Sequence, residues 1–151
     1  MNSISYNIDY HLNKADVNSI EKHLLSCDSF FEPPLSSYIN IQEYSKKLFC
    51  KAINFEAWSE DRLIGLISVY LNDIKSKVAY ISNVSVDLGY HNRGIASALL
   101  SKAIAYSVEK GFQSIKLDVF ERNTIAINLY LKMGFKKSIS VSKKQTMIRF
   151  F

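Results

Sequence analysis

Apolar and polar residues alternate in the first segment of the chain, where the apolar positions are Ile4, Tyr6, Ile8 and Tyr10. A period of two places these side chains on one face of a strand, so residues 3–10 are predicted to form a half-buried strand. The apolar spacing then changes to that of a helix in residues 15–27 and 41–52. Asp16 and Asn40 stand where the N-caps of these two helices are expected.

The pattern after residue 52 indicates several strands in succession. Short apolar segments occupy residues 55–58, 63–71 and 78–86, and the segments between them are short and polar. Such spacing is typical of an antiparallel meander. Residues 30–37, which contain Pro33 and Pro34, are predicted to form a loop between the two helices.

The second half of the chain alternates helices with strands. The segments that we expect are a helix at 93–110, a strand at 114–120, a helix at 123–133 and a strand pair at 135–139 and 145–150. The order is therefore βααβββαβαββ, which predicts an α/β fold with a mixed, mostly antiparallel sheet. A right-handed crossover makes strands 78–86 and 114–120 parallel. Divergence of this pair would expose the helix that starts at Arg93, at the strand end where ligands bind in open α/β sheets.

Composition indicates one ordinary globular domain over residues 1–151, with 48% hydrophobic and 22% charged residues. No secretory signal or membrane span is recognisable, so we expect a cytoplasmic protein with no membrane partner. Cys27 and Cys50 are expected to be reduced thiols. His11, His23 and His91 show no metal-ligand spacing with them, so no metal is predicted.

The net charge of +5 permits nucleic-acid binding and also suits a phosphate-rich small molecule. The lysines are scattered, and no basic helix or aromatic-basic RNA motif stands out. We therefore expect no nucleic-acid partner. A monomer and a homodimer are both compatible with the sequence.

Residues 89–100 read GYHNRGIASALL and place Gly94 in the first turn of the predicted helix. A glycine inside a helix costs about 0.5–1 kcal/mol relative to alanine, so some other requirement should offset that cost. The first N–H groups of a helix have no intrahelical partner, and the helix dipole favours anions there. Gly94 would let phosphate oxygens approach these amides. Alternatively, the glycine only permits a tight turn.

The six residues from His91 to Ala96 resemble the Gln/Arg-x-x-Gly-x-Gly/Ala signature of the GNAT superfamily of N-acetyltransferases, in which this loop cradles the pyrophosphate of acetyl-CoA. His91 departs from the usual Gln or Arg. The segment NVSVD, residues 83–87, looks like the family's fourth strand. Residues 117–135, LDVFERNTIAINLYLKMGF, resemble the segment in which an Asn opens a helix and a Tyr follows seven residues later. The resemblance is specific from residue 63 to 137 and rests on topology before residue 52.

The resemblance implies a role for each matching residue. Val84, Ser85 and Val86 would pair with the pantetheine arm, and the Val84 amide would act as an oxyanion donor. Asn123 would bond the same arm, and Tyr130 would protonate the departing thiolate. A buried, purely structural aromatic is the alternative for Tyr130. The residues implied to hold the pyrophosphate are His91, Asn92, Arg93, Gly94, Ile95, Ala96 and Ser97.

The implied reaction is direct transfer of an acetyl group from acetyl-CoA, as cosubstrate, to a primary amine. Asp118 occupies the position where the ribosomal-protein N-terminal acetyltransferase branch carries a glutamate, so it is a candidate general base. Its side chain lies opposite the apolar face of its strand and need not face the core. A solvated carboxylate is the alternative, with a water chain or a backbone carbonyl acting as the base.

The acceptor site is expected where residues 30–38 meet the strand ends and the loop at 140–144. Glu32 or Glu56 could attract a cationic amine. The aromatic residues that could stack on the acceptor are Tyr38, Trp58 and Tyr70. The alternative for each of these five residues is a role in packing or an ordinary surface position. A small-molecule acceptor such as an amino sugar is favoured. The alternatives are a protein N-terminal or lysine acetyltransferase and a non-catalytic CoA-binding module, although retention of both Asn123 and Tyr130 argues against the latter.

Overall fold

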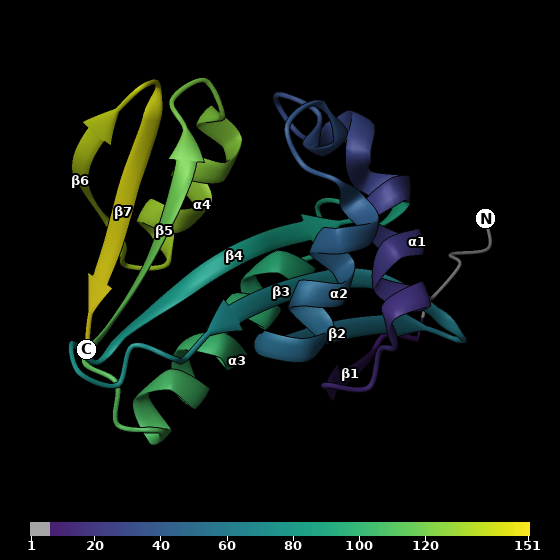
Figure 1. Ribbon diagram of the computed structural model, residues 1–151, viewed down its shortest axis with the longest axis horizontal. Helices are drawn as coiled ribbons and strands as arrows, with labels where there is room; N and C mark the ends of the chain where they lie inside the picture. Colours follow the sequence, from purple (N-terminus) through teal and green to yellow (C-terminus); the bar gives the residue numbers. More distant parts are fainter. Residues whose placement is uncertain (1–6) are drawn as a thin grey trace, which may run out of the picture.

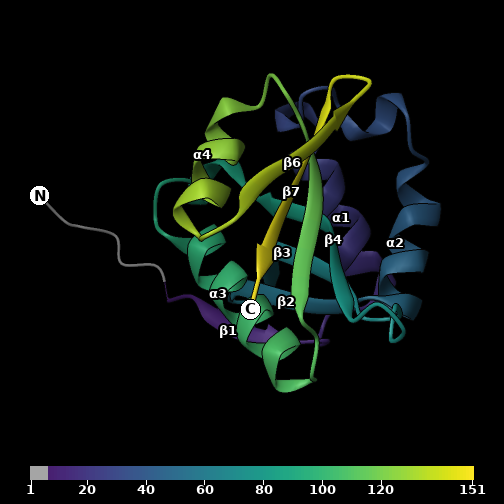
Figure 2. The same cartoon turned by 90° about the vertical axis from the view of Figure 1, so that its left-hand side faces the viewer.

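The computed structural model describes residues 7–151 as a seven-stranded mixed sheet with helices on both faces (Figure 1). The elements are β1 (Asp9–Leu12), α1 (Val17–Cys27), α2 (Ile41–Lys51), β2 (Ile53–Ser59), β3 (Arg62–Tyr70), β4 (Val78–Val86), α3 (Ile95–Glu109), β5 (Ser114–Phe120), α4 (Thr124–Lys132), β6 (Lys136–Val141) and β7 (Lys144–Phe150). Short 3-10 turns cover Asp28–Phe30, Leu35–Ser37 and Leu88–Tyr90. Figure 2 shows α1 and α2 on one face of the sheet and α3 and α4 on the other. The predicted order of elements is confirmed.

The first two helices begin at the predicted caps. The Asp16 carboxylate accepts a hydrogen bond from the Ser19 N–H at 2.8 Å, and the Asn40 side chain accepts one from the Glu43 N–H at 3.0 Å. Each bond satisfies one of the first-turn N–H groups that have no intrahelical partner.

The first strand differs from its prediction. Residues 3–6 of the predicted strand lie outside the described residues, and β1 spans Asp9–Leu12. All four of its residues are exposed, not half-buried, because β1 is an edge strand that only β2 flanks.

The strands follow the order β1-β2-β3-β4-β5-β7-β6, and among the strands of residues 7–151 only β4 and β5 run parallel. Their pairing covers four residue pairs, from Val78 with Ser114 to Ile81 with Leu117. Beyond Ile81 the two strands diverge, as Figure 1 shows, which confirms the predicted splay. The strand segment after Ile81 therefore has an edge that no neighbouring strand occupies.

A β-bulge lies at the start of the splay. Ser68 of β3 pairs with Asn83 and Val69 pairs with Ile81, so Ser82 has no partner on β3. Ser82 is also the first residue of β4 after the last parallel pair. Bulges bend a strand and are common beside active sites, so this position directs attention to the residues around Ser82.

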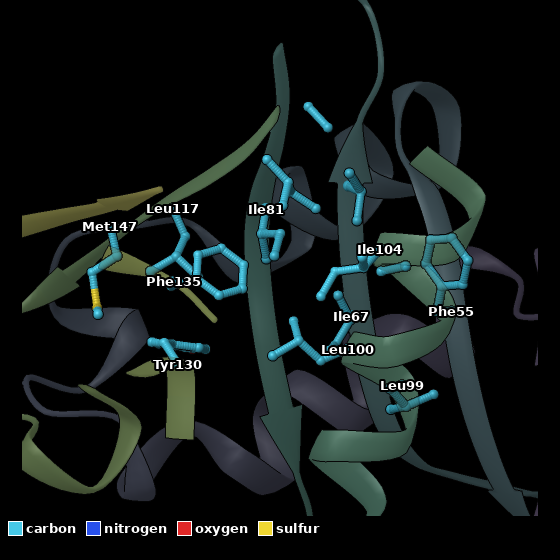
Figure 3. Close-up of a cluster of buried hydrophobic side chains, with 14 of the residues drawn as sticks. Phe55, Ile67, Ile81, Leu99, Leu100, Ile104, Leu117, Tyr130, Phe135 and Met147 are labelled. Carbon is cyan, nitrogen blue, oxygen red and sulfur yellow. The ribbon is translucent and has the colours of Figure 1, made fainter. Parts of the chain in front are cut away.

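The main hydrophobic core continues across the splay. Figure 3 shows Ile81 between two groups of side chains, with Leu99, Leu100 and Ile104 on one side and Leu117, Tyr130, Phe135 and Met147 on the other. This packing holds the three strands β5, β6 and β7 in place relative to β2, β3 and β4 in the region where β4 and β5 no longer pair. Within residues 7–151, none of the helices combines the length and the apolar character that crossing a membrane requires.

Candidate functional site

The open edge of β4 forms a groove, which we call the β4 groove, lined by Cys27, Phe30, Phe31, Val84, Ser85, Val86, His91 and Asn123. The Asp87 N–H donates to the Ile64 carbonyl of β3 at 2.8 Å. The N–H and carbonyl groups of successive residues in a strand point in alternate directions. Those of Val84 and Val86 therefore point away from β3, toward the edge along which β5 no longer pairs with β4. This is the edge on which the resemblance places the pantetheine arm.

His91 closes part of this edge. Its Nε2 donates to the Val86 carbonyl at 2.7 Å, and its ring packs edge-on against Phe30 with the ring centres 6.2 Å apart. The side chain that replaces the family's usual Gln or Arg thus holds the end of β4. The N–H and carbonyl of Val84 and the N–H of Val86 still face the open edge.

Gly94 lies at the N-cap of α3 and not within its first turn. Its φ is +74°, in the left-handed region that side chains disfavour, and Asn92 two residues earlier has a φ of +60°. The expected helix start at Arg93 is therefore two residues early. A Cβ at position 94 would meet no heavy atom within 4 Å. The backbone conformation itself requires the glycine, and the space in front of it is open to a ligand.

The N-terminus of α3 has the properties of an anion site. No side chain from the described residues caps it, and by helix geometry the N–H groups of Ile95, Ala96 and Ser97 have no intrahelical partner. These donors and the positive end of the helix dipole point out of a fifteen-residue helix. Phosphate oxygens are ligands that such an end binds.

A second cavity, the junction cavity, lies within the splay. It contacts both strands and the loop before α2, through Ile81, Ser82, Asn83, Val84, Leu117, Asp118, Val119 and Phe120 and through Phe31, Glu32, Leu35, Tyr38, Asn123 and Tyr130. The structure thus brings Glu32 and Tyr38, predicted from one loop, together with Asp118, Asn123 and Tyr130 from the other half of the chain.

Asn123 and Tyr130 lie at the inner wall of the junction cavity. The Asn123 side-chain oxygen caps α4 by accepting from the Ala126 N–H at 3.2 Å, so its NH₂ group is the part left for a ligand. Tyr130 is 6% exposed and packs against Phe135 with the ring centres 5.9 Å apart. Burial raises the pKa of the Tyr130 phenol, so it carries its proton at neutral pH.

Asp118 is exposed and faces away from the core, as its position in the strand predicted. One carboxylate oxygen accepts from the Tyr80 hydroxyl at 3.0 Å, and the other accepts from the Thr146 hydroxyl at 2.5 Å. Burial and the adjacent carboxylate raise the pKa of Tyr80 to about 12. Asp118 is thus held in place by neutral donors and still borders the junction cavity.

A third cavity of about 520 Å³, the tyrosine cavity, opens on the α2 side of the splay. Its walls include Tyr38, Tyr44, Tyr70, Tyr80, Ser82, Asp118 and Phe120, with Glu43 and Lys47 from α2 and Lys144 from β7. Tyr38 and Tyr70 were expected here. Tyr44 and Tyr80 were missed, although alternation in strand 78–86 does place Tyr80 opposite the core.

Tyr44 connects α2 to the bulge of β4. Its hydroxyl lies 2.6 Å from the Ser82 hydroxyl and donates to the Ser82 carbonyl at 3.0 Å. This hydrogen bond holds the bulged residue, Ser82, from the face of the sheet that α2 covers. No sequence pattern links these two residues, because the contact depends on how α2 packs.

The structure does not bring Trp58 to these cavities, contrary to the prediction. Trp58 is 6% exposed within the second hydrophobic cluster, and its indole N–H donates to the Glu56 carboxylate at 2.9 Å. Glu56 also accepts from the N–H groups of Lys14 and Ala15. A buried carboxylate needs such donors, so Trp58 and Glu56 fasten the start of α1 and do not contact an acceptor.

One of the histidines does have metal-ligand spacing with a cysteine, contrary to the prediction. His23 and Cys27 lie one turn apart on α1, and Asp87 approaches them so that the three possible ligand atoms lie within 4.8 Å of one another. Arg62 forms an ion pair with Asp87 at 2.6 Å. Burial and the neighbouring Asp87 raise the pKa of the Cys27 thiol to about 12, so the thiol keeps its proton.

His23 supports the β4 groove from behind. Its Nδ1 donates to the Leu63 carbonyl at 3.1 Å, and its Nε2 accepts from the Ser85 hydroxyl at 2.8 Å. Burial lowers the pKa of His23, in accord with a neutral ring that can accept at Nε2. Both ring nitrogens are thus engaged with protein partners.

Known proteins resemble this chain in sequence and in fold. An uncharacterized N-acetyltransferase of Methanocaldococcus jannaschii is 35% identical over 75 residues, which are 50% of this chain and 33% of that protein. An N-alpha-acetyltransferase of Arabidopsis thaliana is 29% identical over 117 residues, which are 76% of this chain and 62% of that protein. The chain thus spans less than two thirds of each relative.

The solved structure of a PaiA N-acetyltransferase from Thermoplasma acidophilum, in complex with coenzyme A, matches the fold with a TM-score of 0.75 at 18% identity. The match covers 95% of this chain and 99% of that one. The sequence profile of the Acetyltransferase (GNAT) family matches residues 17–135. That match covers most of the chain and contains both the loop before α3 and the splayed strands, so the chain belongs to the acetyltransferase (GNAT) family.

Proposed function

We propose that this protein is an acetyl-CoA-dependent N-acetyltransferase that acts on a small primary amine. One observation carries the proposal, namely that the junction cavity lies next to each of the other two cavities and shares wall residues with both. It shares Phe31, Val84 and Asn123 with the β4 groove, and Tyr38, Ser82 and Asp118 among others with the tyrosine cavity. A molecule in the groove and another in the tyrosine cavity would therefore approach each other at the junction cavity, which both Val84 and Tyr130 line.

The residues of the β4 groove fit the coenzyme. The uncapped N-terminus of α3, with open space in front of Gly94, suits a pyrophosphate. The open edge of β4 offers backbone donors and acceptors to the amide groups of a pantetheine arm, and Asn123, whose NH₂ group is left for a ligand, also lines the groove. Bound acetyl-CoA would supply the activated acetyl group as a thioester.

The side chains around the junction cavity can assist direct transfer. The amine nitrogen forms a bond to the carbonyl carbon, and the carbon–sulfur bond breaks with its electron pair on sulfur. Val84 would donate its N–H to the carbonyl oxygen as negative charge develops there. Asp118, directly or through water, would accept the proton that the ammonium must lose. Tyr130 would give its proton to the sulfur, and the second proton that the nitrogen loses as the amide forms would return to Tyr130 through solvent.

The tyrosine cavity supports a small acceptor. Its volume of about 520 Å³ lies within the ordinary range of small-molecule sites, roughly 300–1,000 Å³. A protein N-terminus is the second candidate acceptor, because the Arabidopsis relative named an N-alpha-acetyltransferase matches 76% of this chain. We place the reaction in the cytoplasm, where Cys27 and Cys50 would stay reduced.

Release of free coenzyme A thiol from acetyl-CoA tests the proposal. Small amines, amino sugars and peptides with free N-termini would be offered in parallel, and acetylated products identified by mass spectrometry. We expect turnover with a small amine. Turnover with peptides alone would establish the second candidate. Binding of acetyl-CoA without turnover on any acceptor would favour a non-catalytic CoA-binding module.

A further inference from the structure

The charges of the tyrosine cavity define the acceptor more closely. Resting on the proposed function, we propose that the acceptor is a primary amine that also carries an anionic group, a carboxylate or a phosphate, and that Lys47 and Lys144 bind that group. The two lysines come from α2 and β7 and line the same cavity.

Within the described part of the chain, neither lysine has a carboxylate within 4 Å. Among residues 7–151, the ion pairs within 4 Å are those of Asp87 with His23 and Arg62. The Lys47 ammonium instead lies 5.4 Å from the ring centre of Tyr70, and the Lys144 ammonium lies 5.2 Å from that of Phe120. An aromatic face attracts a cation but satisfies none of its N–H groups by a strong acceptor. Both ammonium groups are therefore available to an anion in the cavity.

Positive and negative charges are separated along the cavity. Asp118 borders both the junction cavity and the tyrosine cavity, whereas Lys47, Lys144 and Glu43 border the tyrosine cavity and not the junction. The outer part thus carries a net charge of +1, and the end at which transfer would occur carries a carboxylate. An acceptor with its ammonium group at Asp118 and its anionic group farther out matches both ends.

The walls between the two charged ends are aromatic. Tyr38, Tyr44, Tyr70 and Tyr80 line the cavity, which suits the body of a ligand that joins an amine to an anionic group. The Tyr70 hydroxyl interacts with the Ser82 side chain but forms no hydrogen bond of ordinary geometry among residues 7–151. Buried hydroxyls usually form one, so a polar group of the ligand could complete this contact in the wall of the cavity.

The lysines are not placed to bind the coenzyme. The tyrosine cavity shares no lining residue with the β4 groove. The anion site at the α3 N-terminus follows the carboxyl end of β4, whereas Tyr80 and Ser82 lie earlier on that strand, on either side of the point where the splay begins. Loss of Lys47 or Lys144 should therefore alter the acceptor preference and leave acetyl-CoA binding unchanged.

Matched pairs of amines test the inference. Tryptophan and tryptamine are compared as acceptors that differ by a carboxylate. Phosphoethanolamine and ethanolamine are compared as acceptors that differ by a phosphate. In at least one pair we expect kcat/KM to be at least about tenfold higher for the anionic member. Lys47→Gln combined with Lys144→Gln should lower kcat/KM for that member about 10–100-fold, mainly through KM, and change the neutral member less than about twofold. Lys46→Gln, an exposed neighbour outside the cavity, is the control and should change neither.

Binding to the coenzyme A-saturated protein is measured alongside turnover, by calorimetry with the same amines. Tighter binding of the anionic member, lost in the double variant, supports the inference even if no transfer occurs, and that result would count against the proposed function alone. Transfer with equal kcat/KM within both pairs, or equal loss for both members in the double variant, would overturn the inference and leave the proposed function intact. Equal binding of both members without transfer would overturn both.

Discussion

The β4 groove and the tyrosine cavity are built in opposite ways. The backbone hydrogen-bonding groups of the groove and of its anion site come from one continuous stretch, residues 84–97, and side chains such as Phe30, Phe31 and Asn123 complete its walls. The tyrosine cavity is made of side chains from the segment before α2 and from several helices and strands, with Tyr44 on α2, Tyr70 on β3 and Lys144 on β7 among them. Backbone groups are the same in every chain, whereas side chains differ, so the first suits a shared coenzyme and the second suits a particular acceptor.

The largest effect should come from Gly94→Val. A β-branched residue at φ +74° is strained by roughly 1–3 kcal/mol, and relief of that strain would move several N–H groups of the anion site together. We expect the affinity for acetyl-CoA to fall about 100-fold or more, measured by calorimetry. Gly89→Ala, at a glycine without positive φ and with open space around it, is the control and should bind normally. Normal binding by Gly94→Val would mean that the groove does not depend on this backbone.

Tyr130→Phe tests whether a side chain at the junction contributes chemistry as well as packing. The ring and its contact with Phe135 stay, and only the hydroxyl is removed. General-acid assistance contributes typically 10²–10⁴-fold, and a thiolate is already a good leaving group, so we expect kcat to fall about 10–100-fold. Acetyl-CoA affinity should stay within a few-fold. An unchanged kcat would assign Tyr130 to the core alone.

Asp118→Asn should have a smaller effect, a loss of about 3–10-fold in kcat, because water can replace a general base in part. The acid limb of the pH–rate profile should move at the same time. Asp9→Asn, on the exposed edge strand, is the control and should leave both unchanged. If the profile of Asp118→Asn matches that of the unaltered protein, Asp118 holds Tyr80 and Thr146 without acting as the base.

The smallest effect should be a dependence of stability on pH through His23. Burial lowers its pKa in the folded protein below the ordinary value of 6.5, so the unfolded chain binds the proton first. Stability should be full above about pH 6.5 and fall as the pH decreases from there toward the folded pKa. Protonation of Nε2 also removes the acceptor for Ser85, so acid should weaken the β4 groove before the tyrosine cavity. Thermal unfolding from pH 7.5 to 5 measures this effect, and His23→Gln should reduce it.

The sequence was informative wherever the pattern is local. The element order, the caps at Asp16 and Asn40 and the parallel pair followed from periodicity and turn residues. The bulge at Ser82 did not follow, since the extra residue is defined only by pairing with β3. Trp58 was misplaced because its neighbour Glu56 is buried, and a carboxylate in a strand gives no sign of burial.

The candidate site likewise has parts that are local in sequence and could be predicted, and parts that depend on packing and could not. The anion site could be predicted because Gly94 and the helix after it are adjacent in sequence. Tyr44 and the two lysines of the tyrosine cavity could not, because their positions depend on how α2 and β7 pack against the sheet. The cluster of His23 and Cys27 with Asp87 was likewise missed, because Asp87 is 60 residues from Cys27 in the chain.

The short parallel seam between β4 and β5 has a consequence for motion. Four residue pairs join the two halves of the sheet, whereas β5 and β7 pair along seven residues within their own half. A small rotation about the seam widens or narrows the splay without breaking the antiparallel pairing of β1 to β4 on one side or of β5, β7 and β6 on the other. The resistance to that rotation comes from side chains such as Ile81, Leu117 and Phe135, which pack across the splay. Amide hydrogens of the seam should therefore exchange with solvent sooner than those of β5 and β7, and ligands that fill the splay should slow them most.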